Sequence, residues 1–203
     1  MNKSLSLSLI LIIVSLNTMA QSIEITPQYG YQIGSKYNYY GGYIKLSSSD
    51  QYGFTANINL GRDTEAEFYW VHQNTDVRIK DRLDYLHETF LTDVTVNHYQ
   101  LGAIHTFGDN DDALPFFGMS LGWSTFNPDD KLYKSSTKFT IGISGGFKYF
   151  FSDHIGIRLQ TQLLMPIEWG GVYFSSGGGS GVTAGGTLLQ LNFSGGLIFA
   201  FGR

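Results

Sequence analysis

Residues 188–201, LLQLNFSGGLIFAF, decide the fold. Their side chains separate with a period of two residues, so that large apolar residues share one face and polar or small residues share the other. The apolar face consists of Leu189, Leu191, Phe193, Leu197, Phe199 and Phe201, and the polar face of Gln190, Asn192, Ser194 and Gly196. Such a long two-faced strand is typical of a barrel wall with lipid outside and a polar interior. The sequence therefore predicts that this strand closes a transmembrane β-barrel.

The same alternation recurs in seven earlier segments. They are residues 23–33, 51–60, 65–73, 93–107, 114–126, 137–151 and 155–166. We therefore predict an all-β fold, an eight-stranded antiparallel transmembrane β-barrel connected as an up-and-down meander. Residues 43–46 also have strand character, but a ninth strand does not suit a single-chain bacterial barrel, so we interpret residues 34–50 as an extracellular loop with a short strand extension.

One predicted strand changes parity along its length. In residues 93–107, Leu101 and Ala103 share the outer face, whereas Val94 and Val96 fall on the opposite parity. A β-bulge near His98 would reconcile the two halves, because a bulge inserts one extra residue into a strand. The alternative is that the upper half of this strand lies beyond the lipid.

The composition lies between that of a soluble β-protein and that of a helical membrane protein. The chain has 203 residues, a net charge of −4, 13 Tyr, 15 Phe and 25 Gly, and only 15% of its residues are charged. The mildly acidic balance gives no indication of a nucleic-acid partner. With no cysteine, the chain has neither a disulfide nor a lipidated N-terminal Cys.

The first 20 residues predict a secretory signal peptide. Lys3 precedes an apolar run over residues 5–16, which is too short and too rich in serine to span a membrane as a helix. Small residues around Ala20 favour cleavage after that position. We therefore expect an exported chain with one barrel domain over residues 21–203.

Two connecting segments differ from the strands. Residues 74–92 are highly charged, and Ile79, Leu83, Leu86 and Phe90 recur at three- and four-residue steps, which allows a short amphipathic helix. Residues 170–186 are rich in Gly and Ser and indicate a mobile external loop without a phosphate-binding motif.

Aromatic residues predict the two membrane interfaces. Trp70, Trp123 and Trp169 end the third, fifth and seventh predicted strands, which run outward if both termini lie in the periplasm. Phe107, Phe151 and Phe201 end the inward strands and would form an inner girdle. The short turns at residues 61–64, 108–113 and 152–154 then fall on the periplasmic side, and the longer loops fall outside. Four tyrosines near the first long loop could contact ligands or belong to the outer girdle: Tyr37, Tyr39, Tyr40 and Tyr43.

These patterns resemble the small eight-stranded outer-membrane barrels of Gram-negative bacteria, the OmpA/OmpX/OmpW-like porin family. The resemblance rests on SIEITPQYGY from Ser22, LPFFGMSLG from Leu114, FSDHIGIRL from Phe151 and the aromatic last strand. It implies an outer-membrane location, contact with membrane lipid and lipopolysaccharide, a monomer, and insertion by the barrel-assembly machinery. That machinery often recognises a terminal Phe, whereas Phe201 here is followed by Gly202 and Arg203.

Strand parity places five charged side chains in the interior. They are Glu24, Glu65, Glu67, Lys148 and Arg158. Because an eight-stranded barrel is narrow enough for side chains to fill, these charges must pair or be hydrated. We interpret them as a lumen charge network that acts as a structural plug, with a gate as the alternative.

No residue pattern indicates catalysis or a cofactor. The five histidines, His72, His87, His98, His105 and His154, lack metal-site spacing with a carboxylate, and no histidine clearly joins the inward Ser120 and Ser124. We therefore predict a non-enzymatic protein without metal or cofactor. The predicted function is a structural or surface-interaction role, and the alternative is a narrow passive channel for small or hydrophobic solutes.

Overall fold

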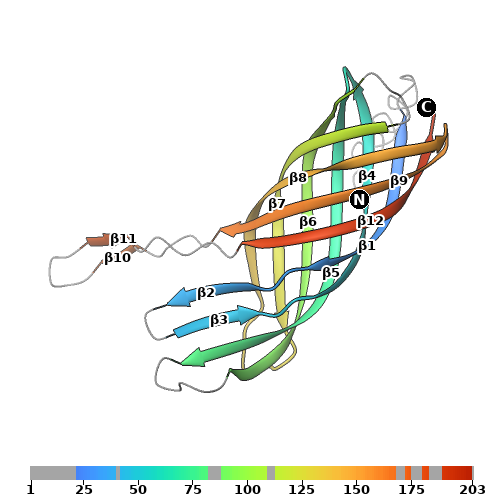
Figure 1. The fold of residues 1–203 in the computed structure, drawn as a ribbon. Coiled ribbons are helices and arrows are strands. Elements are labelled where there is room, and N and C mark those ends of the chain that lie inside the picture. The colour runs from blue at the N-terminus through green and yellow to red at the C-terminus, as the bar shows by residue number, and fades with distance from the viewer. Residues whose placement is uncertain are drawn as a thin grey trace, which may run out of the picture.

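The structure is a computed structural model that describes residues 22–39, 42–81, 88–108, 113–167, 172–174, 180–182 and 189–202. These residues form a closed antiparallel barrel of eight long strands (Figure 1). The barrel strands are β1 (Ile23–Gln32), β4 (Ser49–Gly61), β5 (Thr64–Asp81), β6 (Thr89–Thr106), β7 (Ala113–Pro128), β8 (Ser136–Ser152), β9 (Ile155–Ile167) and β12 (Gln190–Phe201). The short strands are β2 (Ser35–Tyr39), β3 (Gly42–Leu46), β10 (Val172–Phe174) and β11 (Ser180–Val182). The predicted all-β fold is confirmed.

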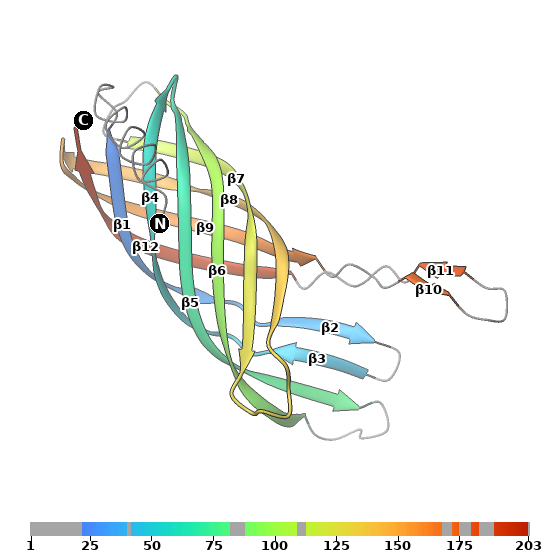
Figure 2. The ribbon, with the colours of Figure 1, turned by 180° about the vertical axis from the view of Figure 1, so that it is seen from behind.

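The barrel closes as the sequence predicts. Each long strand pairs with the next one along the chain, and β12 returns to β1 with Ile23 opposite Phe201. Figure 2, which shows the barrel from behind, presents β4, β5 and β6 as one continuous wall. Because every edge of the eight-stranded ring is paired, no open sheet edge crosses the region that lipid would cover.

The predicted alternation of side chains is confirmed along the barrel strands. In β12, Gln190, Asn192 and Ser194 are buried in the interior, whereas Phe193 and Leu197 are about half exposed on the outside. In β7 the outward residues Phe117, Met119, Leu121 and Trp123 are all at least half exposed. The barrel wall exposes large apolar side chains and buries polar ones, which is the reverse of the arrangement in a soluble protein. This arrangement suits a surface in contact with lipid hydrocarbon.

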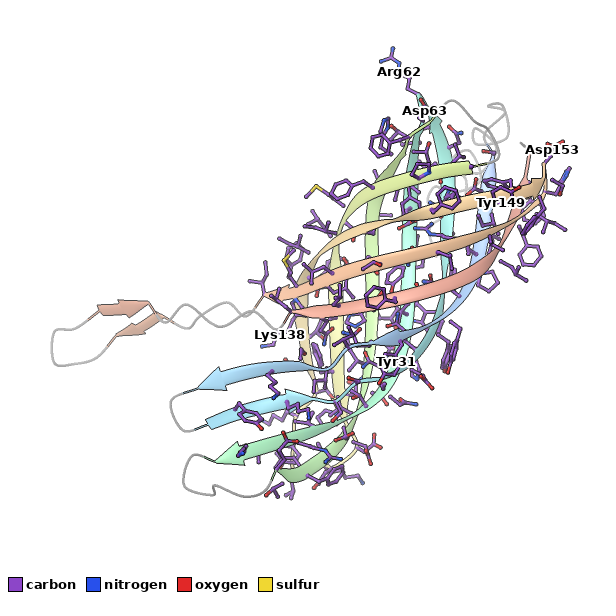
Figure 3. All side chains as sticks on the ribbon, in the orientation of Figure 1. Tyr31, Arg62, Asp63, Lys138, Tyr149 and Asp153 are labelled. Atoms are coloured by element: carbon purple, nitrogen blue, oxygen red, sulfur yellow. The ribbon has the colours of Figure 1, made fainter. Side chains whose placement is uncertain are left out.

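Short turns close one end of the barrel. At the β4–β5 turn, Arg62 and Asp63 both have positive φ (53° and 59°), which is the backbone of a type I′ hairpin turn. Figure 3 shows Arg62, Asp63 and Asp153 of the β8–β9 turn at the same end, with Lys138 toward the other. Ile23 pairs with both Phe201 and Ile58, so the start of β1 and the end of β12 lie at this end as well.

The structure corrects the prediction for residues 74–92. Strand β5 continues to Asp81 and β6 begins at Thr89, so Ile79 and Phe90 lie on strands and the predicted amphipathic helix is wrong for these parts. Residues 34–50 also contain more strand than expected, because β2 and β3 form a hairpin whose β3 pairs with the upper part of β5. In Figure 1 these strands form a sheet that projects from the barrel on the side of the long loops.

The predicted bulge near His98 is wrong. Strand β6 keeps one parity throughout, with Val94 (3% exposed), Val96 and His98 (0%) all facing the interior. Its pairing with β7 runs without a shift from Val94 to Thr106, and the irregularity in its pairing with β5 falls at Val77 and Arg78. The interior at this level is therefore partly apolar, which is why the valines broke the sequence pattern.

Several predictions fall on residues that the structure does not describe or describes only in part. The signal peptide, His87 and Trp169 lie outside the described residues, and so does most of the predicted loop 170–186. The described parts of that loop are β10 and β11, which pair with each other. Among the described residues, none belongs to a helix of the length and hydropathy needed to cross a bilayer.

Candidate functional site in the barrel interior

The five charged residues predicted for the interior meet in one layer of the lumen. Glu24 comes from β1, Glu65 and Glu67 from β5, Lys148 from β8 and Arg158 from β9, and all five are at most 6% exposed. Each sits at the inward parity of its strand, at the end of the barrel with the short turns. The strands therefore bring three carboxylates and two cations together. We call these five side chains the charge network.

Lys148 bridges two carboxylates that lie across the lumen from its own strand. Its Nζ lies 2.5 Å from Glu24 Oε2 and 2.6 Å from Glu65 Oε2. The lysine itself is fully buried. Because hydrogen bonds between ions are short and strong, this arrangement ties β8 to β1 and to β5 across the lumen.

Arg158 makes the second cross-link. Its Nη2 lies 2.6 Å from Glu67 Oε2, and its Nε donates to Gln160 Oε1 at 2.8 Å. Asn57 Nδ2 donates to the same Glu67 oxygen at 3.0 Å, and the guanidinium lies 4.4 Å from the ring centre of Phe116. A planar cation held by a carboxylate, amides and an aromatic face has most of its recognition surface occupied.

An apolar layer lies in the lumen beside the charge network, toward the short turns. Phe150, Ile198 and Ala200 are each at most 3% exposed and pack together, with Leu114 against them. These residues belong to β8, β12 and β7 near the short turns. The apolar layer therefore lies at the same end of the barrel as the short turns.

Amide side chains line the lumen on the other side of the charge network. They come from six of the barrel strands, and each is at most 1% exposed. This amide layer consists of Gln32, Gln51, Gln73, Gln100, Gln162, Gln190 and Asn192. At least one amide atom of each has no hydrogen-bond partner within the protein. The sequence signal for this amide layer is a Gln or Asn that recurs at inward-facing positions of successive strands.

The structure also joins a histidine to an inward serine, which the sequence did not reveal. His98 Nδ1 lies 2.7 Å from Ser124 Oγ, and Ser124 Oγ lies 2.6 Å from Thr140 Oγ1. All three side chains are fully buried, so a substrate has no direct access to the serine. The other described histidines lie apart: His72 contacts Asn97, His105 contacts Thr64, and His154 lies in a turn. Within the described ranges, no three potential ligands are grouped closely enough to hold a metal ion.

The aromatic girdle residues lie at two levels of the outer surface. Trp70 and Trp123 belong to one row across the wall, in which Trp70 pairs with Tyr99, and Tyr99 pairs with Trp123. Trp70 does not end its strand as predicted, because β5 continues to Asp81. At the other end Phe107, Phe151 and Phe201 are 49–63% exposed.

The two levels are separated by a membrane-like height. The eight residue steps from Tyr99, in the tryptophan row, to Phe107 span roughly 26 Å along the strand at about 3.3 Å each. For a strand tilt of about 40°, this corresponds to roughly 20 Å along the barrel axis, which is comparable to the usual apolar band of about 25 Å.

The projecting sheet carries its own polar contacts. Glu88 accepts a hydrogen bond from the Tyr43 hydroxyl at 2.7 Å, and Lys45 Nζ lies 3.3 Å from the same carboxylate. These contacts connect β3 to the segment that leads into β6. Asp76 makes a similar set of contacts, with Arg78 and with Ser47. Together, the contacts of Glu88 and of Asp76 hold β3 and the residues next to it against β5 and β6.

Acidification is expected to loosen this sheet. The hydrogen bond from Tyr43 and then the Lys45 ammonium hold the pKa of Glu88 below its usual 4.5. A depressed pKa contributes stability above the usual value, and this contribution is lost as the pH falls through the folded-state value. Amide hydrogen exchange in residues 42–46, corrected for the intrinsic rate, should therefore accelerate below about pH 4.5. In Glu88→Gln this exchange should already be fast at pH 7. An identical pH profile of exchange in the wild type and the variant would contradict the role assigned to Glu88.

The closed eight-stranded wall, the outward apolar face and the two aromatic levels define the fold of a small outer-membrane β-barrel. Solved structures with this fold include Neisserial surface protein A, 11% identical, with a TM-score of 0.59 over 90% of this chain and 98% of that one. Another is outer membrane protein OprG from Pseudomonas aeruginosa, 14% identical, with a TM-score of 0.59 over 89% of this chain and 95% of that one. The predicted resemblance is confirmed for the fold. No protein-family model and no curated protein sequence matches the chain.

Proposed function

We propose that this chain is a monomeric outer-membrane protein with a structural or surface-contact role and a lumen closed by its own side chains. The observation that carries the proposal is the charge network, in which Lys148 and Arg158 are at most 1% exposed and each contacts a carboxylate on the far wall. Charges held in this way at a narrow lumen leave no free cation to attract a solute. The apolar layer of Phe150, Ile198 and Ala200 adds a second closure.

The same proposal includes the surroundings of the barrel. The outer wall would contact membrane lipid and lipopolysaccharide, and the barrel-assembly machinery would insert the chain, with Phe201 as the terminal aromatic signal. Export would depend on the predicted signal peptide. The projecting sheet of β2, β3 and the upper parts of β5 and β6 is the surface best suited to contact other molecules, since it extends beyond the barrel wall (Figure 1).

A non-enzymatic role fits the interior chemistry. His98 contacts Ser124 through Nδ1, and the pair is fully buried in the lumen. A serine nucleophile needs a substrate at its oxygen and a third group that orients the histidine. Lipid A from cells that overexpress the protein should therefore keep its mass, and a shifted mass would contradict this part of the proposal.

The alternative of a narrow channel is favoured by one observation, the amide layer. Its side chains line the lumen with hydrogen-bonding groups that lack partners within the protein. Water or a small polar solute could supply the missing hydrogen bonds. The layer does not extend through the charge network, so a channel requires that the network opens.

Glu67→Gln separates the plug from the gate. If the network is a plug, the variant should lose about 2 kcal/mol of unfolding free energy, since Arg158 then contacts a neutral amide in place of a carboxylate. Planar-bilayer recordings of the wild type and the variant should both be silent. Steady conductance steps in the wild type would favour the channel, and steps that appear only in the variant would favour a gate. Unchanged stability together with silence would remove both interpretations of Glu67.

A further inference from the structure

Three cations lie in one row across the projecting sheet. Lys36 on β2 is the direct cross-strand partner of Lys45 on β3, and Lys45 is the partner of Arg78 on β5. Two inter-strand spacings correspond to about 10 Å, so the row is short. Like charges directly opposite each other destabilise a sheet. The row therefore weakens the sheet, and a function outside folding would account for it.

A fourth cation and an aromatic ring extend the row into a patch. Tyr43 and Lys80 are cross-strand partners one row further from the barrel. Residues two apart in a strand share a face, so Tyr43 lies beside Lys45 and Lys80 lies beside Arg78. The Lys36 ammonium lies 4.9 Å from the centre of the Tyr43 ring, so β2 and β3 contribute to the same face. We call the four cations of this face the cationic patch.

Two carboxylates neutralise only part of the cationic patch. Glu88 Oε2 lies 3.3 Å from Lys45 Nζ, and Asp76 Oδ2 lies 2.7 Å from Arg78 Nε. Four cations against these two carboxylates leave a charge of +2, although the whole chain carries −4. A local positive surface on a negatively charged chain attracts anions to that surface.

The cationic patch faces outward, beyond the level of the membrane. Asp76, which contacts Arg78, has the same outward parity on β5 as Trp70. Arg78 is eight residues beyond Trp70, which is about 26 Å along the strand. In Figure 1 and Figure 2, β2, β3 and the end of β5 project past the barrel wall. With the short turns in the periplasm, the patch is presented to the outside of the cell.

Acidic residues lie between the cationic patch and the membrane surface. Asp76 and Asp93 are direct cross-strand partners on β5 and β6, and the Asp129 N–H donates to the carbonyl oxygen of Asp93. The three residues line one hollow on this wall. Phosphate groups at the membrane surface would meet these carboxylates before they reach the patch. An anion that binds the patch therefore approaches from the external solution.

We propose that the cationic patch binds an anionic polysaccharide that carries sulfate or phosphate groups and approaches from outside the cell. Ammonium and guanidinium groups form short, charge-assisted hydrogen bonds with such groups. A polymer contacts several of the four cations at once, so that weak individual contacts add up to a higher avidity. The inference rests on the proposed surface-contact role and names the class of partner.

Binding of dextran sulfate to the folded full chain tests the proposal, with uncharged dextran of the same length as the reference. The protein is kept in a zwitterionic detergent, and binding is followed by fluorescence of the labelled polymer. We expect dextran sulfate to bind at least tenfold more tightly than dextran, with a smaller difference at high salt, because salt screens exposed charges. Equal binding of the two polymers would overturn the proposal.

Lys36→Gln/Lys80→Gln removes the two cations outside the ion pairs that hold the sheet. This variant should bind dextran sulfate at least tenfold more weakly, whereas Lys36→Arg/Lys80→Arg should stay within twofold of the wild type. Lys131→Gln/Lys134→Gln removes the same charge from exposed residues of the β7–β8 loop and is the matched control. It should also stay within twofold of the wild type. Unchanged affinity in the first variant, or an equal loss in the control, would overturn the proposal.

Retention of lipopolysaccharide in detergent distinguishes the membrane's own glycolipid from an external polymer. The wild type and Lys36→Gln/Lys80→Gln should retain the same amount, because the cationic patch lies beyond the membrane surface. At least tenfold lower retention by the variant would place lipopolysaccharide on the patch and overturn the proposal. A wild type that remains soluble without detergent would instead refute the membrane location on which the proposed function rests.

Discussion

Arg158→Met is expected to lower the free energy of unfolding by about 3–5 kcal/mol, the usual cost of removing one partner from a buried ion pair. The side chain is 1% exposed, and its Nη2 lies 2.6 Å from Glu67 Oε2. Without the guanidinium, Glu67 keeps only the hydrogen bond from Asn57, and Gln160 loses the donor at its Oε1. Unfolding by guanidinium chloride in lipid vesicles, followed by tryptophan fluorescence, measures the loss of unfolding free energy.

The double variant Glu67→Gln/Arg158→Met is the control for packing. It removes both charges, and buried ion pairs replaced by neutral groups of similar volume often leave stability nearly unchanged. We expect it to recover most of the loss, which corresponds to a coupling of at least about 2 kcal/mol between the two residues. If the double variant is no more stable than Arg158→Met alone, the loss reflects the packing of Arg158 against Phe116 and not its charge.

The sequence predicted the inward and outward faces well because a lipid-facing wall enforces a period of two. Glu24 and Arg158 are both buried as their strand parity indicated, although they lie on strands far apart in the chain. Parity, however, says nothing about height in the barrel. His98 and Ser124 are direct partners on the neighbouring strands β6 and β7, so their contact depends on the pairing register of those two strands, which parity alone does not give.

The prediction failed where β5 continues beyond Gln73, the predicted end of its strand. The strand runs on for eight residues to Asp81, with Asp76, Arg78 and Lys80 on one face and Val77 and Ile79 on the other. The strand is held there by pairing with β3 and β6 and by contacts such as that between Glu88 and Tyr43. The apolar face of this extension has only two residues. Its many charges, and the three- and four-residue steps between apolar residues from Ile79 onward, made the segment resemble a charged loop with a short helix.

Replacement of Lys148 should have a larger effect than replacement of Arg158, because Lys148 serves two carboxylates. Its Nζ lies 2.5 Å from Glu24 Oε2 and 2.6 Å from Glu65 Oε2, so these two oxygens are at most about 5 Å apart. Two negative charges at that distance repel by ~3 kcal/mol at an effective dielectric constant of about 20. This repulsion adds to the cost of leaving each carboxylate buried without a cation.

Lys148→Met should therefore fail to reach the folded, heat-modifiable form at neutral pH, as judged by gel mobility of unheated samples after refolding into lipid vesicles. The triple variant Glu24→Gln/Glu65→Gln/Lys148→Met removes the repulsion together with the cation and should fold again. The comparison distinguishes charge balance from shape, since both variants carry the same methionine. If both fail, the buried volume of Lys148 matters more than its charge, and if Lys148→Met folds with wild-type stability, the two carboxylates do not depend on this cation. The expected pair of results would mean that β1, β5 and β8 are held at their spacing by one ammonium, which makes closure of the barrel and closure of its lumen the same event.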